Sequence, residues 1–550
     1  MRVYSIARLS SWIVLAAAIF FTGSFLFSEE EFVEQVYNWQ KPPHRKRPRA
    51  EFVKTAQHID LKDALFFTLE NNVSIKIAKM VEAQQVGTVR LSAGPFNPIL
   101  SATATNSYNT DVITGTTRSN ESIIVTTSTV SASKMMRSGT LMALTASVDR
   151  THDGSIPKPN NNLNYGTIAF KIVQPLLRGF RYGKPAMTEV VAILELQAAY
   201  WTKLQAISQS IYDASVLYWE LVSAVKVLKV QEEALGRYAV IVEQTKSLIA
   251  SGLSARSEID QPLAQLAAQQ VTVTLAQEDL FNAYHNFKFG IGDENICLPF
   301  EIELVLEDFP EIVIDSVAYQ KEMDNFLIEA LDRRFDIQAA LIQEEVAETN
   351  LLLAENDWLP ILNITAGIAN SDFANGSQAK PLFTTWDMTD PQTDWAIGFE
   401  FSYPLFNDRG SGAIQQQTAA RWQAHYERQL IVQTAIRDIR ETTIDILALT
   451  KALVQVNYAV QDYQDVVDNE SSLLQEGMIT IFEYIEYQDR LTNALTSRIL
   501  IQKQLTKAVA NLRFLTATLI TEEPDCTYAV VDSRTVPFGG VKNGNERFQK

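Results

Sequence analysis

The sequence predicts a mainly helical fold with a smaller β portion, arranged as two internal structural repeats. The first sign of the repeats is a set of apolar residues that recur every seven positions in each half of the chain. The two arrays are Ile207, Ala214, Leu221, Leu228, Leu235, Val242 and Ile249, and Val432, Ile439, Ile446, Leu453, Val460, Val467 and Leu474. A sustained seven-residue period makes helices supercoil around their neighbours, so we expect long antiparallel coiled-coil helices. The second sign is that each half also contains extended segments in which polar and apolar residues alternate, as in strands with one wet face.

Each repeat is expected to run from an opening helix through strands into the long helix and back through a shorter helix. The first repeat covers 60–322, with strands over about 99–175 and the long helix over about 182–250. The second covers 323–520, with strands over about 361–404 and the long helix over about 410–475. The opening helices, 60–94 and about 324–355, are each expected to stack end to end with the returning helix, beside the long one. Proline lacks a backbone donor and restricts the residue before it, so it marks the helix–strand junctions. These prolines are Pro98, Pro175, Pro360 and Pro404.

The strands carry the features expected of a transmembrane β-barrel, although a soluble sandwich would give the same alternation. Aromatic residues near the strand ends, Trp395, Tyr403 and Tyr165, favour the barrel because they resemble interfacial girdles. A charge facing lipid near the midplane would cost about 2–4 kcal/mol, so Lys171 and Glu400 are expected to face the lumen. One chain supplies about four strands by this count, and known barrels begin at eight. Several copies must therefore share one barrel, and a trimer would leave room for passage.

The ends of the chain are predicted to lie outside the two repeats. Residues 1–28 read as a secretory signal peptide, with a single membrane anchor as the alternative. A linker over 29–59 and a flexible tail over 521–550 complete the predicted organisation. The net charge of -18 disfavours nucleic acid as a partner. The two cysteines, Cys297 and Cys526, follow equivalent helices and could form a disulfide, or remain two thiols.

Several short motifs resemble those of the TolC-like outer-membrane factors, also called outer membrane efflux proteins. They are Leu61-Lys62-Asp63-Ala64-Leu65 with Glu70-Asn71-Asn72, Gln174-Pro175-Leu176-Leu177-Arg178-Gly179-Phe180, Tyr403-Pro404-Leu405-Phe406, and Gly477 followed by Phe482-Glu483-Tyr484-Ile485-Glu486. The resemblance implies a homotrimer in the bacterial outer membrane, with twelve strands and a periplasmic tunnel of helices. It also implies docking to a periplasmic adaptor (membrane fusion protein) and an inner-membrane transporter. An additional extended pair, about 121–132 and 139–149, is expected outside the bilayer.

The resemblance also indicates a gate at the tip of the tunnel. The tip turns are placed at Gly252 and Gly477, where glycine after a long helix is the expected left-handed cap. In the family, acidic residues at the positions of Glu483 and Glu486 form rings in the constriction, and Glu258 is the counterpart of Glu483 in the first repeat. The alternative is that these are surface charges at helix N-termini, favoured by the helix dipole.

The tip also departs from the family pattern. Ile479 and Leu474 stand where the family's best-known member has a basic and an aromatic residue that hold the tip shut. The closed state here could rest on apolar contacts instead, or be looser.

The sequence does not predict an enzyme. The five histidines are scattered without metal-ligand spacing, and no Gly-rich phosphate loop follows a strand, so no catalytic, metal or cofactor site is expected. Three functions remain open. The first is a passive exit channel for small molecules in a tripartite efflux system, and the second is the outer-membrane component of type I protein secretion. The third belongs to another class, a non-conducting coiled-coil spacer or adhesin of the envelope.

Overall fold

A computed structural model describes residues 58–113, 119–153, 162–252, 255–293, 305–312, 316–376, 385, 392–475, 478–522 and 528–530. These residues form two compact units. One, here called the sheet unit, takes its described residues from 84–197 and 342–425. The other, the helical unit, takes them from 45–83, 198–341 and 426–550. The predicted signal peptide, most of the predicted linker and most of the tail lie outside the described residues.

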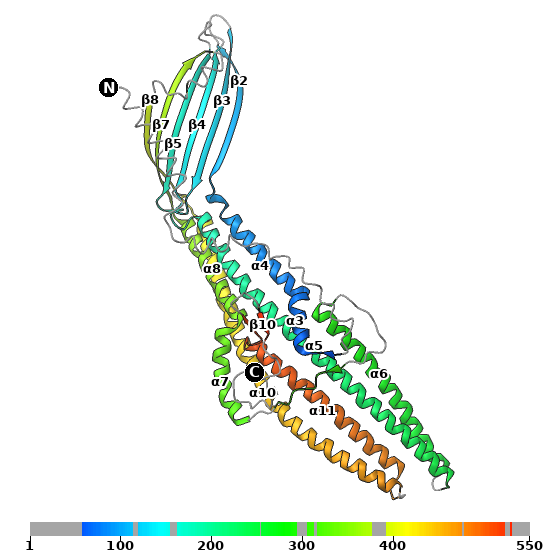
Figure 1. Ribbon diagram of the computed structural model, residues 1–550. Coiled ribbons are helices and arrows are strands. Elements are labelled where there is room, and N and C mark those ends of the chain that lie inside the picture. Colours follow the sequence, from blue (N-terminus) through cyan, green and yellow to red (C-terminus); the bar gives the residue numbers. More distant parts are fainter. Residues whose placement is uncertain are drawn as a thin grey trace, which may run out of the picture. The chain divides into compact units, whose positions relative to one another are not determined.

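The sheet unit is built on one antiparallel sheet with the strand order β2-β3-β4-β5-β7-β8 (Figure 1). Its strands are β2 (Ile99–Ile113), β3 (Ser119–Met135), β4 (Leu141–Asp153), β5 (Asn162–Pro175), β7 (Ile361–Asn375) and β8 (Gln392–Ser402). The expectation of four strands per chain is therefore wrong, because the sheet has six. The additional pair is β3 and β4, which lies within the sheet between β2 and β5. Its backbone groups pair with all of β2 and with residues 162–173 of β5, which a hairpin set apart from the sheet could not do.

The strand register separates the side chains of the sheet into two faces of different character. One line of paired residues joins Leu144, Phe170, Ile368 and Trp395, and the next joins Met142, Ile172, Ala366 and Ile397. These lines define the apolar face. The opposite face, here called the polar face, carries Lys171 and the small residues Ala143, Gly367 and Ala396 along one line. Because side chains alternate along each strand, this register fixes which residues share a face.

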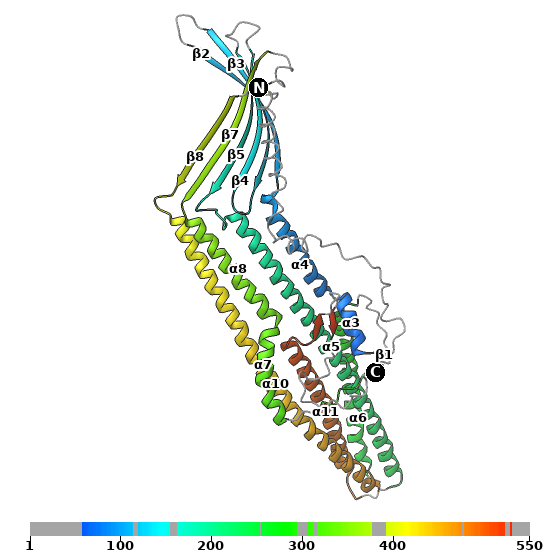
Figure 2. The same ribbon diagram turned by 60° about the vertical axis from the view of Figure 1, so that its left-hand side comes forward.

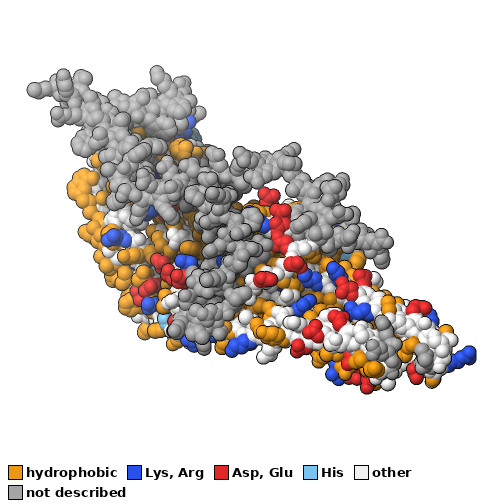
Figure 3. All heavy atoms as spheres, turned by 60° about the horizontal axis from the view of Figure 1, so that its bottom comes forward, with side chains coloured by type: hydrophobic (Ala, Val, Ile, Leu, Met, Phe, Trp, Pro, Cys, Tyr) orange, Lys and Arg blue, Asp and Glu red, His pale blue; other side chains and the backbone are white. Residues whose placement is uncertain are grey.

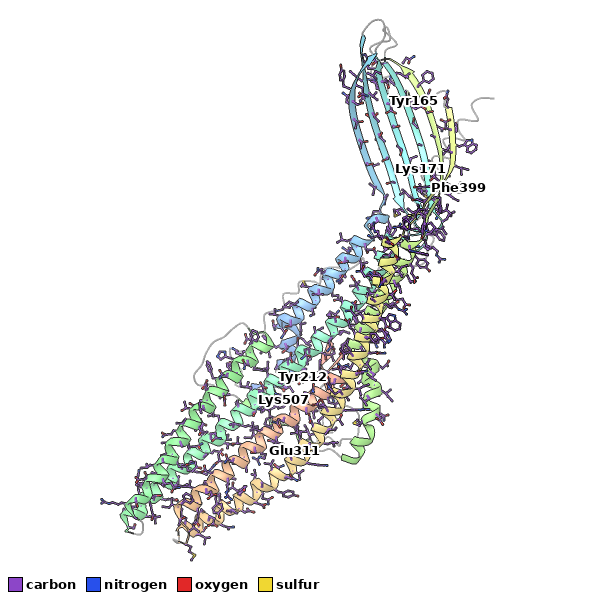
Figure 4. The ribbon with its side chains drawn as sticks, turned by 180° about the vertical axis from the view of Figure 1, so that it is seen from behind. Tyr165, Lys171, Tyr212, Glu311, Phe399 and Lys507 are labelled. Atoms are coloured by element: carbon purple, nitrogen blue, oxygen red, sulfur yellow. The ribbon has the colours of Figure 1, made fainter. Side chains whose placement is uncertain are left out.

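The charged residues that were expected to share an environment do lie on one face. Lys171 and Glu400 are both on the polar face, and Asn363 on β7 donates its amide to the Glu400 carboxylate at 3.0 Å. Tyr165 is paired with Phe373 and also lies on the polar face, whereas Trp395 and Phe399 lie on the apolar face (Figure 4). Tyr165 and Trp395, both expected to resemble residues of interfacial girdles, therefore lie on opposite faces of the sheet.

The turns between sheet and helices are held by backbone bonds around the predicted prolines. Pro98 precedes β2, Pro175 is the last residue of β5, Pro360 precedes β7, and Pro404 follows β8. The segment after β5 stays beside β7, since the Leu176 N–H donates to the Leu362 carbonyl at 2.8 Å and the Gly179 N–H to Asn356 Oδ1 at 2.9 Å. The Arg137 guanidinium at the β3–β4 turn binds both oxygens of the buried Glu189 carboxylate, at 2.7 and 2.8 Å.

The remaining described residues are largely helical (Figure 2). The helices are α3 (Leu61–Asn71), α4 (Val73–Ser92), α5 (Lys184–Ala250), α6 (Asp260–Ile291), α7 (Ser316–Arg333), α8 (Phe335–Trp358), α10 (Asp408–Gln475) and α11 (Ile481–Leu515), with short helices η1 (Gly94–Phe96) and η2 (Arg256–Ile259). Two small sheets pair β1 (His58–Ile59) with β6 (Val305–Leu306) and β9 (Ile520–Glu522) with β10 (Tyr528–Val530). None of the described helices has a stretch long and apolar enough to cross a membrane.

The core of the helical unit is built on the seven-residue arrays. No residue of either array is exposed, and Ile207, Leu221, Ile439 and Ile446 are completely buried. They pack with residues of the shorter helices, such as Phe287 of α6 and Val509 of α11. The repeat therefore places the long helices as predicted, by giving each a continuous apolar stripe.

Each opening helix is interrupted once, at Asn72 and at Arg334, where unbroken helices were expected. Asn72 Oδ1 accepts the Ser74 N–H at 2.8 Å and so caps α4, while its amide donates to the Gly290 carbonyl of α6 at 2.7 Å. Arg334 Nη1 donates to the Leu515 carbonyl of α11 at 3.4 Å. In both repeats, a side chain at the interruption thus satisfies a carbonyl at the C-terminal end of the returning helix, which has no partner within its own helix.

Candidate functional site at the ends of the helical hairpins

The helical unit contains two hairpins, α5–α6 and α10–α11, whose turns carry the predicted tip residues. Gly252 follows α5 with a φ of +75°, and its N–H donates to the Ile249 carbonyl at 3.1 Å. A Cβ at this position would meet nothing within 4 Å, so the left-handed backbone and not crowding selects glycine. Gly477, the second predicted turn residue, lies outside the described residues.

Glu483 takes part in the start of α11. It occupies the third position of the helix and forms a capping box with Thr480. The Glu483 carboxylate accepts the Thr480 N–H at 3.1 Å, and the Glu483 N–H donates to the Thr480 hydroxyl at 3.3 Å. Within one chain, the contacts of Glu483 are therefore those of the helix-start alternative. Its side chain remains exposed, so the carboxylate is still accessible from solvent.

Glu486 lies one turn further along α11 and pairs with Arg490, whose Nη2 lies 2.5 Å from Glu486 Oε1. The hydrogen bond and the charge of Glu486 raise the pKa of the Arg490 guanidinium. Both side chains are about half exposed, at 51% and 50%, so this ion pair adds little to stability. Glu258 lies on η2 at the start of the other returning helix and is exposed.

The two residues that depart from the family pattern, Leu474 and Ile479, lie in an apolar cluster near the second turn. Leu474 is buried against Ile481, Tyr484 and Ile485, and Ile479 packs against the same cluster. These two residues therefore take part in apolar packing within one chain, and the contacts that close the tip stay a prediction.

A polar contact between the two hairpins lies next to this cluster and was not predicted. Tyr238 of α5 donates its hydroxyl to Asp489 Oδ1 of α11 at 2.6 Å. Gln265 of α6 donates to both oxygens of the same carboxylate, at 3.0 and 3.2 Å. Burial and the bond to Asp489 raise the pKa of the Tyr238 phenol. We call these three residues the Asp489 clamp.

The clamp continues into a wider set of polar contacts on the same helices. Arg237 donates to Thr492 Oγ1 at 2.9 Å, and buried Gln269 donates to the Gln231 side chain at 2.8 Å. Further along the same pair of helices, Lys507 of α11 binds Glu220 of α5 at 2.8 Å, and Tyr212 stacks on Phe514 (Figure 4). The helices α5 and α11 are therefore joined by specific polar contacts as well as by apolar packing.

Other candidate residues give no further site. Cys297 and Cys526 lie outside the described residues. Within the described part of the chain, no group of three or more His, Cys, Asp or Glu side chains is placed to hold a metal ion. On the helical surface seen in Figure 3, acidic and basic side chains are interspersed and form no large patch of one sign.

Comparison with known proteins gives a family match over part of the chain, similar sequences and the fold. The family described as outer membrane efflux protein matches residues 327–518. The outer membrane protein TolC of Vibrio cholerae is 24% identical over 307 residues, covering 54% of this chain and 66% of that protein, just under two thirds of its length. TolC of Escherichia coli is 22% identical over 369 residues, covering 65% of this chain and 71% of that protein.

Solved structures agree with this assignment at the level of the fold. The outer-membrane channel OprN has a TM-score of 0.62 at 14% identity, covering 83% of this chain and 90% of that one. The outer membrane protein VceC of Vibrio cholerae has a TM-score of 0.58 at 18% identity, covering 84% and 95%.

The chain resembles the TolC-like outer membrane efflux proteins, and residues 327–518 carry the match to the family.

The TolC proteins that it resembles are outer membrane proteins, and their family is a non-enzymatic one. Its mainly helical fold with long helices and an antiparallel sheet is that of the family's solved members. Sequence reasoning found the long helices, the prolines at the junctions and the polar and apolar faces. It missed the Asp489 clamp, because nothing local to Tyr238 or Asp489 marks them as partners.

Proposed function

We propose that this chain forms a homotrimeric exit channel of a tripartite efflux system. The channel conducts small molecules passively across the outer membrane, after an inner-membrane transporter and a periplasmic adaptor deliver them to the helical unit. The resemblance to this family supports the class of function. The choice of small molecules as cargo, and of the adaptor and transporter as partners, is part of the proposal.

The observation that carries the proposal is the division of the sheet into an apolar and a polar face. Trp395, Ile397, Phe399 and Phe401 on β8 are all strongly exposed, at 65–76%. A single chain in water would expose this apolar surface at a high cost in free energy. Lipid contact removes that cost, while the small and polar residues of the other face can line a water-filled passage. A non-conducting spacer or adhesin would have no use for this arrangement.

The proposed gate consists of Glu483 and Glu486, with Glu258 as a further acidic residue at the other turn. In a threefold assembly, each glutamate would meet two copies of itself around the axis. Like charges at close range raise carboxylate pKa values and attract cations. The capping box is compatible with this role because it uses the Glu483 carboxylate without burying it.

Ion conductance of the purified protein in planar lipid bilayers tests the channel. We expect discrete conductance steps that multivalent cations block from the side of the helical unit. Protein that inserts into the bilayer without conducting ions would contradict the proposal. The cargo can then be tested in cells that carry the cognate transporter. The measurement is whether small toxic compounds and an exported polypeptide compete for export.

A further inference from the structure

We propose that three copies of this chain close a barrel of eighteen strands, six from each copy, in which β8 of one copy pairs with β2 of the next. In this contact Ser402 lies opposite Ile99, and Glu400 opposite Ser101. The inference rests on the homotrimer of the proposed function and adds the width of its barrel and the residues of its closing contact.

The two edges of the sheet are the surfaces that this contact would use. Among the described strands, β2 has only β3 as a neighbour and β8 has only β7. Each edge therefore presents a row of backbone groups that can pair with another strand. Every neighbouring pair across the six strands is antiparallel, so β2 and β8 run in opposite directions. A second copy of this chain thus offers each edge an antiparallel partner that continues the sheet.

The two faces restrict how these edges can pair. On β8, the apolar face carries Phe399 and Phe401, and on β2 it carries Leu100 and Ala102. A closed barrel must keep this face continuous, because a shift of one residue would turn the aromatic residues of β8 inward. The allowed registers therefore differ by steps of two residues, and Phe401 opposite Leu100 is one of them.

The strand tilt that each allowed register of β8 against β2 would produce selects among these registers. Starting from Ile99, the paired residues straight across the sheet are Ser133, Ala143, Lys171, Gly367 and Ala396. The end of β8, Ser402, lies six residues beyond Ala396. If Ser402 lies opposite Ile99 of the next copy, the strand register shifts by six residues across each copy. Around a barrel of three copies the total stagger is then eighteen residues.

That offset corresponds to a strand tilt of about 35°, with a rise of about 3.3 Å per residue and about 4.8 Å between strands. Barrels have tilts of about 35–45°. A register two residues shorter gives about 25°, which is too small. A register two residues longer gives about 43°, but it sets Pro404, which has no N–H, opposite Ile99 in the ladder. The register that joins Ser402 to Ile99 is therefore favoured.

The inclusion of β3 and β4 has a direct consequence for the passage. At a tilt of about 35°, eighteen strands give a backbone diameter of about 34 Å, whereas twelve would give about 22 Å. Barrels of this larger size contain an aqueous channel. Along the line from Ser133 to Ala396, the polar face has only one long side chain, Lys171, and the longer side chains of Tyr165, Phe373 and Glu400 lie on other lines of this face. The inference therefore predicts a wider passage than twelve strands would give.

Disulfide formation between introduced cysteines tests the contact. The full chain carries Ser101→Cys and Glu400→Cys, with Cys297→Ser and Cys526→Ser to remove other thiols. We expect mild oxidation of isolated outer membranes to give covalent dimers and trimers on a denaturing gel. The matched control replaces Ser101→Cys by Thr103→Cys, on the same face and two residues away, and should give few or no cross-links. Ser101→Cys with Ser131→Cys should join within one chain, since the two hydroxyls lie 2.7 Å apart.

The outcomes separate this inference from the proposed function. Cross-linking through Thr103→Cys in place of Ser101→Cys would overturn the register. A disulfide between Ser101→Cys and Lys171→Cys would place β2 beside β5, and so overturn the place of β3 and β4 in the barrel. A trimer by native mass spectrometry that gives neither intermolecular cross-link would overturn closure through these edges. A monomer would contradict the proposed trimer itself.

Discussion

Tyr238 of α5 and Asp489 of α11 are joined by a 2.6 Å hydrogen bond, although they are separated by 251 positions in the sequence. Tyr238 is 1% exposed, and Gln265 of α6 binds the same carboxylate. The second hairpin is thus attached to both helices of the first through one aspartate. A movement that separates the hairpins within a chain must break these bonds.

Removal of the Tyr238 hydroxyl should weaken the helical unit. Tyr238→Phe keeps the ring in its apolar cluster and deletes one bond to a charged acceptor, for which we expect a loss of about 1.5–3 kcal/mol in the free energy of unfolding. Denaturant unfolding in detergent, followed by circular dichroism, measures this. Gln464→Ala, which removes an exposed hydrogen bond to Asp468 on α10, is the control and should change stability little. Equal changes in the free energy of unfolding in both variants would contradict a specific stabilising role of the Asp489 clamp.

The same bond predicts a loss of stability at alkaline pH. The pKa of Tyr238 is raised in the folded chain above the ordinary value of 10.0. The stabilisation that this shift represents is fully present below pH 10, where both states hold the proton, and is lost as the pH rises through the folded-state pKa. The free energy of unfolding should therefore fall less steeply with pH above pH 10 in Tyr238→Phe than in the natural chain. Parallel pH dependence in the two proteins would argue against it.

The contact between α6 and the interruption at Asn72 should depend on a single glycine. Gly292 has a φ of +81°, and a Cβ there would lie 2.8 Å from the Asn71 carbonyl group. Gly292→Ala should therefore destabilise the chain by about 1–3 kcal/mol. The matched control is Gly236→Ala inside α5, where a Cβ meets nothing within 4 Å. Alanine is the better helix former, so this variant should gain about 0.5–1 kcal/mol. Similar thermal unfolding of both variants would contradict the assigned role of Gly292.

Two substitutions of Glu483 should separate helix capping from charge. Glu483→Gln keeps a side chain that can complete the capping box, so its stability should be close to that of the natural chain. It lacks the charge, so block of the channel by multivalent cations should weaken, and more so in combination with Glu486→Gln. Glu483→Ala should weaken block and also reduce stability, by about 1 kcal/mol. Arg490→Gln, which removes the cation paired with Glu486, changes the net charge in the opposite direction and should not weaken block. Unchanged block in the Gln variants would remove these residues from the gate.

The features that could be read from the sequence are those set by local periodicity. The seven-residue arrays predict long helices because a buried stripe needs only regular spacing, and residues such as Ile207 and Ile446 lie where that spacing puts them. Alternation likewise gives the two faces of β7 and β8.

Features that depend on pairing between distant segments could not be read in this way. Strand β3 is rich in Ser and Thr, so its alternation is weak, and its place between β2 and β4 follows from a register that only the folded sheet reveals. The interruptions at Asn72 and Arg334 depend on the carbonyls of Gly290 and Leu515, which come from other helices. The Asp489 clamp has the same origin.

The most direct measurement of the central claim is the number of chains in the conducting particle. Native mass spectrometry of the detergent-extracted protein, on the same preparation that is tested in planar bilayers, gives both values. The account predicts a particle of three chains that conducts ions. A particle of one chain that leaves the bilayer impermeable to ions would contradict it.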